Sequence, residues 1–422
     1  MAPKTVPARG MRDVLPAEKA RREHALATIR AVYRSFGFDE VETPVLEDLS
    51  RLESGQGGEN EKMLFKVLRR GLDAGEAVLP SEAADLGLRF DLTVPLSRYV
   101  ATNAADLRTP AKLMQIGPVF RAERPQKGRY RQFVQCDIDV VGEPGAVAEV
   151  ELVAATDTAL RRLGLTGTTL RLNDRNILTG LLTGCGFPEP DHGSVLITVD
   201  KADKVGLGGV VEELLAKGFP APAVEDLQAR LTGLVGLTDV TTPGLLEAAL
   251  PDAVPTEAVA RLREIAVALS VAAPELTVEF DVSLVRGMGY YTGPIFEMSL
   301  AGETSSIAGG GRYDNMVGRF RGQDLPACGF SIGFERIVDH LEIASDSSRS
   351  VALVHPADAP LGDLVRRQKQ LVEEGFRVAL VKEVKRMGPL LDRLVTEGYG
   401  SVVRAAVAED GALTFAEAKP LS

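Results

Sequence analysis

Two segments joined by a basic stretch constrain the fold of this chain more than any other feature. Residues 111–121 and 131–142 each have the pattern of a β-strand, in which successive side chains point to opposite faces. The stretch between them is polar and contains Gly128, which suits a turn. The sequence therefore predicts a β-hairpin with an unusually long tip.

The tip of this hairpin is strongly basic. Residues 121–131 hold five cations against one anion, Glu123, in a chain whose formal net charge is −11. Clustered arginines suit a polyphosphate, because planar guanidinium donors match pairs of phosphate oxygens. The alternative is a solvated basic loop without a ligand. The cations are Arg121, Arg124, Lys127, Arg129 and Arg131.

Polar residues alternate along the second strand of the hairpin. Gln135, Asp137 and Asp139 share one face, because strand side chains repeat with a period of two. An amide and two acids beside an arginine cluster predict a polar pocket for a cationic or amphoteric small molecule. The alternative is a strand edge that faces solvent.

Two further segments carry candidate site residues. Arg286 lies in a glycine-rich turn within 284–297, followed by Tyr290 and Tyr291, and the glycines permit close approach of backbone to a ligand. A tight hairpin with two packed tyrosines is the alternative. Small residues at the start of 328–338 lead a strand into a helix that bears Arg336, a weak signal when taken alone.

The composition excludes several classes of protein. Hydrophobic residues make up 45% and charged residues 25% of the 422 residues, an ordinary globular balance that predicts two or three domains. No apolar run reaches the roughly 18 residues of a membrane span, and the first residues have no signal-peptide pattern. We therefore expect a cytoplasmic protein with no membrane partner. The negative net charge disfavours nonspecific nucleic-acid binding, so an RNA partner would need local basic patches.

Cysteine and histidine are too scattered to form a site of their own. The three cysteines form no CxxC pair, which argues against a disulfide framework and a thiolate zinc site. The four histidines have no partner motif, so we interpret them as structural or surface residues and predict no metal site. These residues are Cys136, Cys185, Cys328, His24, His192, His340 and His355.

The remaining patterns divide the chain into regions. Apolar residues at three- and four-residue spacing predict a helix over 17–36, and helical patterns separated by Gly and Pro fill 174–272. After the polar linker 343–350, a strand, a helix and a strand predict a small α/β domain with parallel pairing. Other predictions are a half-buried strand at 39–47 interrupted by Pro44, a strand leading into a helix at 86–100, strands at 276–300, and a glycine turn at 309–314.

Taken together, these segments resemble the three motifs of class II aminoacyl-tRNA synthetases, and most closely those of the histidyl-tRNA synthetase family. The resemblance is close over 10–345 and weaker over 350–422. Motif 1 is matched by FGFDEVETPVLE, motif 2 by FRAERPQKGRYRQFVQ and motif 3 by GFSIGFERI. The two histidine-specific signatures are matched by LVRGMGYYTG and AGGGRYDN, and further matching segments are LRFDLTVPLSRY, LNDRNIL and QCDIDVVG.

The resemblance implies an α+β fold and a two-step reaction. The expected architecture is a class II antiparallel sheet flanked by helices, in a homodimer. Its catalytic core would comprise 1–173 and 273–342, with a mainly helical insertion at 174–272 and an α/β anticodon-binding-like domain at 350–422. L-Histidine would be activated by ATP with Mg²⁺ to histidyl-adenylate and then transferred to tRNA(His), by chemistry that is mostly positioning and charge stabilisation.

The resemblance also implies roles for individual residues. Arg121 and Arg286 would be catalytic residues at the α-phosphate of ATP. Glu123 would lie near the adenine, Arg336 would hold the γ-phosphate, and Gln126 would meet the tRNA acceptor end. The histidine α-amino group would be held by Asp91, Thr93 and Gln135, and its imidazole would be read by Asp139, Tyr291 and Tyr313.

Two departures from the family pattern keep alternatives open. Gly289 stands where the family usually has an aspartate beside Arg286, and the C-terminal domain is short. One alternative is a regulatory paralogue that senses histidine for ATP phosphoribosyltransferase without catalysis. Another is an adenylate-forming enzyme for a different amino acid or acceptor. Retention of Arg121, Arg286 and Arg336 argues against the regulator.

Overall fold

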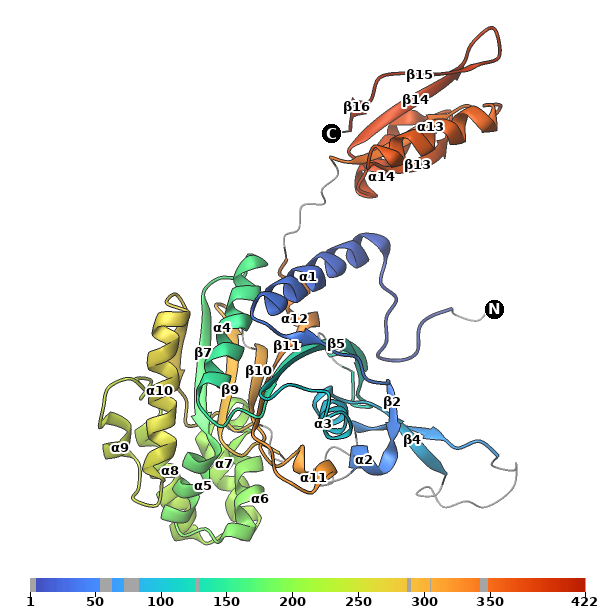
Figure 1. The fold of residues 1–422 in the computed structure, drawn as a ribbon. Coiled ribbons are helices and arrows are strands. Elements are labelled where there is room, and N and C mark those ends of the chain that lie inside the picture. Colours follow the sequence, from blue (N-terminus) through green and yellow to red (C-terminus); the bar gives the residue numbers. More distant parts are fainter. Residues whose placement is uncertain are drawn as a thin grey trace. The chain divides into compact units, whose positions relative to one another are not determined.

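The computed structural model describes residues 5–53, 63–71, 83–125, 129–286, 290–303, 305–341 and 348–421. The chain divides into two compact units, which are described separately (Figure 1). One comprises Met1–Asp13 and Ala25–Leu341, and the other Val14–His24 and Glu342–Ser422. Within the described ranges, no helix is long and apolar enough to cross a membrane.

An eight-stranded sheet is the centre of the larger unit. Neighbouring strands run antiparallel except at its two ends, where β1 pairs with β5 and β7 with β8 in parallel. This confirms the predicted α+β fold with a large antiparallel sheet. In order across the sheet, the strands are β1 (Asp39–Glu40), β5 (Ala111–Phe120), β6 (Gln132–Val141), β11 (Ala327–Gly333), β10 (Ser306–Arg312), β9 (Pro294–Leu300), β7 (Thr168–Asp174) and β8 (Thr277–Phe280).

The predicted hairpin is the longest pairing in this sheet. Strands β5 and β6 are antiparallel from Ala111 opposite Val141 to Phe120 opposite Gln132. The pairing extends toward the tip, because the backbone N–H of Arg121 donates to the carbonyl of Arg131 at 2.8 Å. Gln135, which the sequence placed on the polar face of this strand, is buried rather than exposed to solvent.

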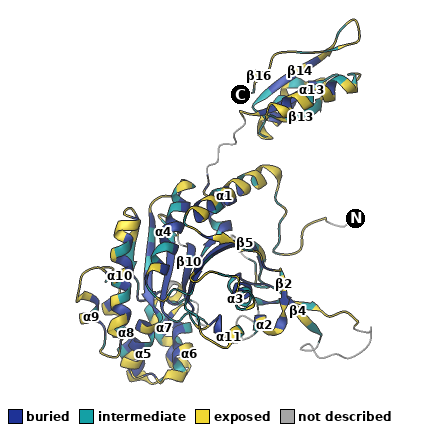
Figure 2. Ribbon diagram, viewed as in Figure 1, coloured by how far each residue is buried: buried dark blue, intermediate teal, exposed yellow. Residues whose placement is uncertain are grey.

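Helices cover the sheet and contribute the core residues beneath it. Helix α4 (Val147–Arg162) packs against β6 and β11, and α10 (Thr256–Ala272) packs against α4 and β7 (Figures 1 and 2). In α1 (Pro16–Ser35), Ile29 and Tyr33 are fully buried, as the three- and four-residue spacing predicts. Short helices α11 (Gly318–Arg321) and α12 (Phe334–Val338) flank β11 in the chain.

The segment predicted as one strand over 39–47 is divided between two sheets. β1 joins the large sheet, whereas β2 (Leu46–Asp48) joins a small antiparallel sheet with β4 (Ala84–Leu88) and β3 (Phe65–Leu68). Pro44 lies between β1 and β2, and its ring nitrogen cannot donate to a strand ladder. Helices α2 (Leu49–Glu53) and α3 (Thr93–Thr102) follow β2 and β4.

The glycine turn predicted at 309–314 is wrong, because residues 306–312 form the central strand β10. A Cβ atom added to Gly310 would lie 2.0 Å from the carbonyl oxygen of Gly329 on β11. The two strand backbones approach too closely at this point for a side chain to fit between them. The glycines therefore serve strand packing here, not a change of chain direction.

Between β7 and β8 the described chain is helical, apart from its connections. The Asp174 side chain begins this segment by accepting the backbone N–H of Asn176 at 2.7 Å, as helix N-caps do. The helices are α5 (Arg175–Gly184), a short 3₁₀ turn (Glu189–Asp191), α6 (His192–Val199), α7 (Ala202–Ala216), α8 (Ala221–Leu234), α9 (Leu245–Ala249) and α10.

The smaller unit contains an α/β sheet. Its strand β12 (Ser350–His355) pairs in parallel with β13 (Arg377–Lys382) and β14 (Ser401–Val407), which confirms the predicted parallel pairing. Helices α13 (Leu361–Glu373) and α14 (Met387–Thr396) contribute to two separate apolar clusters. Two short strands, β15 (Leu413–Phe415) and β16 (Lys419–Pro420), pair antiparallel with β14.

Candidate active site

Four arginines from separate parts of the chain interact electrostatically, and two of them lie at the tip of the long hairpin. Burial lowers the pKa of Arg336, and the positive charges of Arg286, Arg129 and Arg121 lower it further. The Glu297 carboxylate opposes this effect, but one carboxylate among four guanidinium groups leaves an excess of positive charge. This group, called the arginine cluster below, is therefore suited to bind a polyanion such as a chain of phosphates.

The folded hairpin holds Arg121 in place. Its Nε donates to the carbonyl oxygen of Phe90 at 3.0 Å, and its guanidinium carbon lies 5.0 Å from the ring centroid of Phe133. Arg131 stabilises the tip by donating from Nε to the carbonyl oxygen of Glu123 at 2.9 Å. The Glu123 carboxylate lies 3.9 Å from Arg129.

Arg286 and Arg336 share Ser306 as a partner. Arg286 Nη2 donates to Ser306 Oγ at 2.7 Å, while Arg336 Nη1 donates to the carbonyl oxygen of Ser306 and lies 3.2 Å from its Oγ. A Cβ on Gly309 would lie 2.3 Å from Arg286 Nη1, so the absence of a side chain leaves room for this guanidinium. Sequence reasoning missed Ser306, which carries no motif signal of its own.

Glu297 supplies the carboxylate that fixes Arg286. It forms an ion pair with Arg286 Nε and a second with Arg171 Nη2 at 2.6 Å, and it is 7% exposed. Gly289, where the resemblance implies an aspartate, lies outside the described residues. Glu297 therefore orients Arg286 from strand β9, and sequence reasoning missed this residue.

A group of buried acids, called the acidic pocket below after the ligand that it is predicted to hold, adjoins the arginine cluster. Burial raises the pKa of Asp139 to about 7 and that of Asp91 to about 6, and it raises the pKa of Asp137 well above its usual range. The Asp91 and Asp137 carboxylates are also influenced by the charge of Arg121, which places that arginine beside the pocket. Buried acids of this kind favour a ligand that brings positive charge.

Two buried acceptor atoms in this pocket have no hydrogen-bond partner within the described part of the chain. Tyr313 donates its hydroxyl to Asp139 Oδ1, whereas Asp139 Oδ2 is buried and unpaired. Gln135 Nε2 donates to Ser331 Oγ at 3.0 Å, whereas Gln135 Oε1 is buried and unpaired. Buried acceptors without donors are costly, so the pocket suits a ligand rich in N–H groups.

Three tyrosines form an aromatic part of the pocket. The ring centroids of Tyr290 and Tyr291 are 4.5 Å apart, and those of Tyr290 and Tyr313 are 6.4 Å apart. Burial raises the pKa of Tyr290 to about 12, with a further contribution from the charge of Asp91. Asp91 also accepts the backbone N–H of Val94 at 3.2 Å, which places it at the start of α3.

The structure therefore brings most of the predicted site residues into two adjoining groups. Thr93 is the first residue of α3 and lies two residues from Asp91. Gln126, predicted to meet tRNA, lies outside the described residues. The arginine cluster contains Arg121, Arg286 and Arg336, with Glu123 at the tip beside Arg129, and the acidic pocket contains Asp91, Gln135, Asp139, Tyr291 and Tyr313.

The antiparallel sheet, the arginine cluster and the adjoining acidic pocket define a class II aminoacyl-tRNA synthetase. The family model described as histidyl-tRNA synthetase matches residues 10–337, most of the chain. The protein belongs to the histidyl-tRNA synthetase family.

Curated relatives and solved structures agree with this assignment. A histidine–tRNA ligase of Leifsonia xyli subsp. xyli is 47% identical over an aligned length of 438, which covers 100% of this chain and 100% of that one. The crystal structure of histidyl-tRNA synthetase from Nostoc sp. PCC 7120 has a TM-score of 0.75 at 25% identity, covering 98% of this chain and 97% of that one. A Bacillus halodurans structure described as an ATP phosphoribosyltransferase regulatory subunit/histidyl-tRNA synthetase also has a TM-score of 0.75, at 22% identity, covering 95% and 98%.

Proposed function

We propose that this protein is a histidine–tRNA ligase that activates L-histidine with ATP and transfers it to tRNA(His). The observation that carries the proposal is the arginine cluster beside a buried acidic pocket, which matches a polyphosphate next to a cationic amino acid. The full-length relative at 47% identity bears the name of this activity.

In the activation step, the arginines would hold the phosphates of ATP. Arg121 and Arg286 lie at the α-phosphate, Arg336 holds the γ-phosphate, and Glu123 lies near the adenine. A histidine carboxylate oxygen attacks the α-phosphorus, and the bond to the bridging oxygen breaks to release pyrophosphate. Mg²⁺ enters as part of the substrate, bound to ATP oxygens, which are ligands that it prefers.

The acidic pocket would hold histidine. Asp91, Thr93 and Gln135 receive the α-ammonium group, and Asp139, Tyr291 and Tyr313 read the imidazole. The unpaired Gln135 Oε1 and Asp139 Oδ2 are acceptors for the N–H groups of such a ligand. Positioning and charge stabilisation suffice for this reaction, so no protein nucleophile is needed.

Other parts of the chain would serve the tRNA and the assembly. Gln126 meets the acceptor end, 350–422 acts as the anticodon-binding-like domain, and 174–272 is a helical insertion in the catalytic core formed by 1–173 and 273–342. The protein forms a homodimer. ATP and tRNA are available in the cytoplasm, which supports a cytoplasmic location.

A regulatory role without catalysis is the second candidate. The Bacillus halodurans structure carries both descriptions, so the fold alone does not separate the two functions. The arginine cluster favours the ligase. A histidine sensor needs the acidic pocket but has no use for Arg121, Arg286 and Arg336 as ATP ligands.

The test is ATP–pyrophosphate exchange with single amino acids. Histidine should drive exchange, while arginine, lysine and glutamine should not. A pocket whose buried acceptors pair with a substrate's N–H groups rejects analogues that leave them unpaired by about 10⁴-fold. Equal exchange with another amino acid would contradict the substrate assignment, and histidine binding without exchange would favour the regulator.

A further inference from the structure

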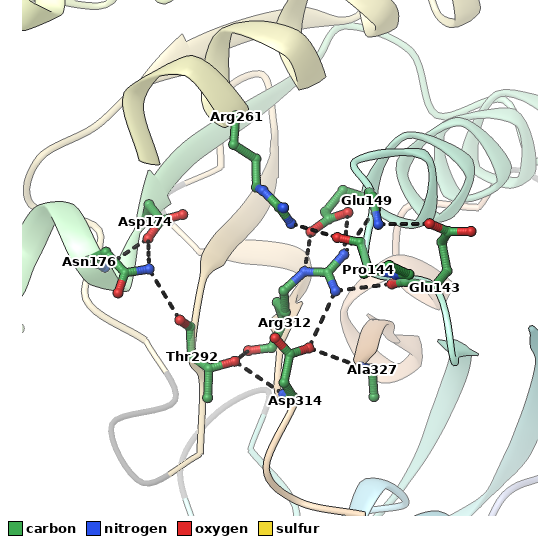
Figure 3. A network of polar contacts seen from close by, with 11 residues as sticks. Glu143, Pro144, Glu149, Asp174, Asn176, Arg261, Thr292, Arg312, Asp314 and Ala327 are labelled. Atoms are coloured by element: carbon green, nitrogen blue, oxygen red, sulfur yellow. Dashed lines mark hydrogen bonds and ion pairs between the residues drawn. The ribbon is translucent and has the colours of Figure 1, made fainter. Parts of the chain in front are cut away.

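A fully buried ion pair lies next to the histidine pocket and has no role in the steps above. Arg312 and Glu149 are 3% and 0% exposed, and they pair through two bonds, Nε to Oε1 at 2.7 Å and Nη2 to Oε2 at 2.9 Å (Figure 3). Glu149 lies in α4, far away in sequence from Arg312 at the end of β10. The pair therefore joins the covering helix to the central strand.

The Arg312 guanidinium has an acceptor for each of its five N–H donors. Besides the two Glu149 oxygens, Nη1 donates to the carbonyl oxygen of Glu143 at 3.1 Å and to Asp314 Oδ1 at 3.3 Å, and Nη2 donates to the carbonyl oxygen of Gly145 at 3.1 Å. Burial acts to lower the pKa of Arg312, but the hydrogen bond and charge of Glu149 outweigh it and raise the pKa. The planar fork is thus charged and fixed in one orientation.

Arg312 is connected, through the chain and through hydrogen bonds, to the two segments that carry Tyr313 and Tyr291. Tyr313 follows Arg312 directly and donates to Asp139 Oδ1. The carbonyl oxygen of Arg312 accepts the backbone N–H of Thr292, the residue after Tyr291, at 2.8 Å. A second link is the bond from the Asp314 N–H to Thr292 Oγ1 at 3.1 Å (Figure 3).

We propose that Arg312 and Glu149 are positioning residues for histidine recognition, holding Tyr313 and Tyr291 in their places without touching the substrate. This inference rests on the proposed function. Fixed hydrogen-bond partners of this kind keep binding groups in productive geometry. In metal sites, loss of the residues that orient the ligands weakens binding about 10- to 100-fold, and we expect an effect of similar size here. Arg286 is anchored at Ser306, at the opposite end of β10 from Arg312, and Arg121 is anchored at Phe90, outside β10. Loss of the pair should therefore affect ATP binding much less than histidine binding.

The experiment compares Glu149→Gln with a matched control on the same helix. Glutamine keeps the size of the side chain but removes the charge and one of the two acceptors. Asp157 is also a buried carboxylate of α4, 2% exposed, which pairs with Arg161 at 2.7 Å and accepts from Thr168 Oγ1 at 3.2 Å, apart from the pocket. Asp157→Asn therefore makes the same chemical change without contact with the pocket network.

Both KM values are measured by ATP–pyrophosphate exchange. Glu149→Gln should raise the KM for histidine about tenfold or more and leave the KM for ATP within about twofold. Asp157→Asn should leave both within about twofold. Arg312→Lys, which keeps a charge beside Glu149 but not the fork, should show the same split as Glu149→Gln and serves if that variant does not fold.

Equal changes in both KM values, or a histidine KM unchanged in Glu149→Gln and Arg312→Lys, would overturn the inference. Loss of histidine affinity in Asp157→Asn to the same extent would also overturn it, because any buried carboxylate of α4 would then have this effect. Failure of the wild-type protein to exchange with histidine would instead reject the proposed function.

Discussion

Asp139 is a buried carboxylate whose pKa of about 7 makes the free protein sensitive to pH. The ordinary value is 3.8, so the folded state binds the proton more tightly than the unfolded state does. The stabilising contribution of this proton is fully present below pH 4 or so and is lost as pH rises through about 7. Asp91, with a pKa of about 6, acts in the same direction.

Asp139→Asn should therefore stabilise the ligand-free protein most at pH 8 and less at pH 5, where only part of the proton's contribution has been lost. Asparagine cannot ionise, and its amide oxygen still accepts the Tyr313 hydroxyl. The shift from 3.8 to about 7 sets an upper limit of about 4 kcal/mol on the difference at pH 8. Urea unfolding of both proteins at the two pH values is the measurement. The same stability difference at both would show that ionisation of Asp139 is not the cause.

Substitution of Arg286 should change the rate of catalysis more than it changes histidine binding. If it stabilises charge on the α-phosphate during bond formation, Arg286→Ala should lower the rate of adenylate formation about 10²- to 10³-fold and change histidine affinity less than about tenfold. Arg286→Lys should recover little, because one ammonium cannot contact both Glu297 and Ser306 as the guanidinium does. Single-turnover adenylate formation is the measurement.

Arg366→Ala is the control for the Arg286 variants. Arg366 is an exposed arginine of α13 whose partner is Asp363, so its loss should leave adenylate formation unchanged. If Arg286→Ala forms adenylate at the same rate as Arg366→Ala, Arg286 does not take part in the chemical step.

At the scale of elements, the effect of a glycine substitution in strand β10 depends on which glycine is replaced. The three atoms nearest to a Cβ on Gly310 would all be backbone atoms of β11, at 2.0, 2.8 and 2.9 Å. A Cβ on Gly309 would meet the end of the Arg286 side chain first, which can move. Gly310→Ala should therefore destabilise the fold by about 3 kcal/mol or more, since overpacking without relief is costly.

Gly309→Ala is the matched comparison within the same strand. It should cost less stability but displace Arg286, and so slow adenylate formation. Thermal unfolding and exchange measured on both variants test the contrast. Similar losses of stability in the two variants would contradict the distinction between backbone and side-chain contact.

The elements were predictable from sequence where one local pattern decides them. The strands at 111–121 and 131–142 and the helix at 17–36 agree with β5, β6 and α1 to within one or two residues. The prediction at 309–314 was wrong because a glycine run has two physical meanings, a turn or a close approach of backbones, and only the neighbouring strand decides between them. The predicted strand over 39–47 was too simple, because local alternation does not say which sheet a segment joins.

The site was predictable in part, for a related reason. Its arginines, acids and tyrosines lie in motifs whose residue types indicate phosphate and amino-acid binding. The residues that hold them in place could not be predicted in this way. Ser306, Glu297 and Glu149 are recognised only by contacts between distant parts of the chain. Such contacts leave no short-range pattern in one sequence.

At the scale of the whole molecule, we predict a twofold dimer built on α1 and β1. β1 is the edge strand of the large sheet and both its residues are exposed, so its outer side is available for pairing. Closed twofold pairing is the commonest arrangement of identical subunits. Light scattering at micromolar concentration should give twice the chain mass of 45.1 kDa. A single species of 45.1 kDa would contradict the dimer.

The arginine cluster also makes the stability of the free protein depend on the anions in its buffer. Four cationic groups held together repel one another, and an anion that settles among them acts as a counter-ion and relieves this repulsion. Pyrophosphate alone should therefore raise the unfolding temperature without histidine, by mass action worth about 2.7 kcal/mol at a hundred times its Kd. The same cluster that favours activation then also retains the leaving group, so pyrophosphate should compete with ATP and slow turnover as it accumulates.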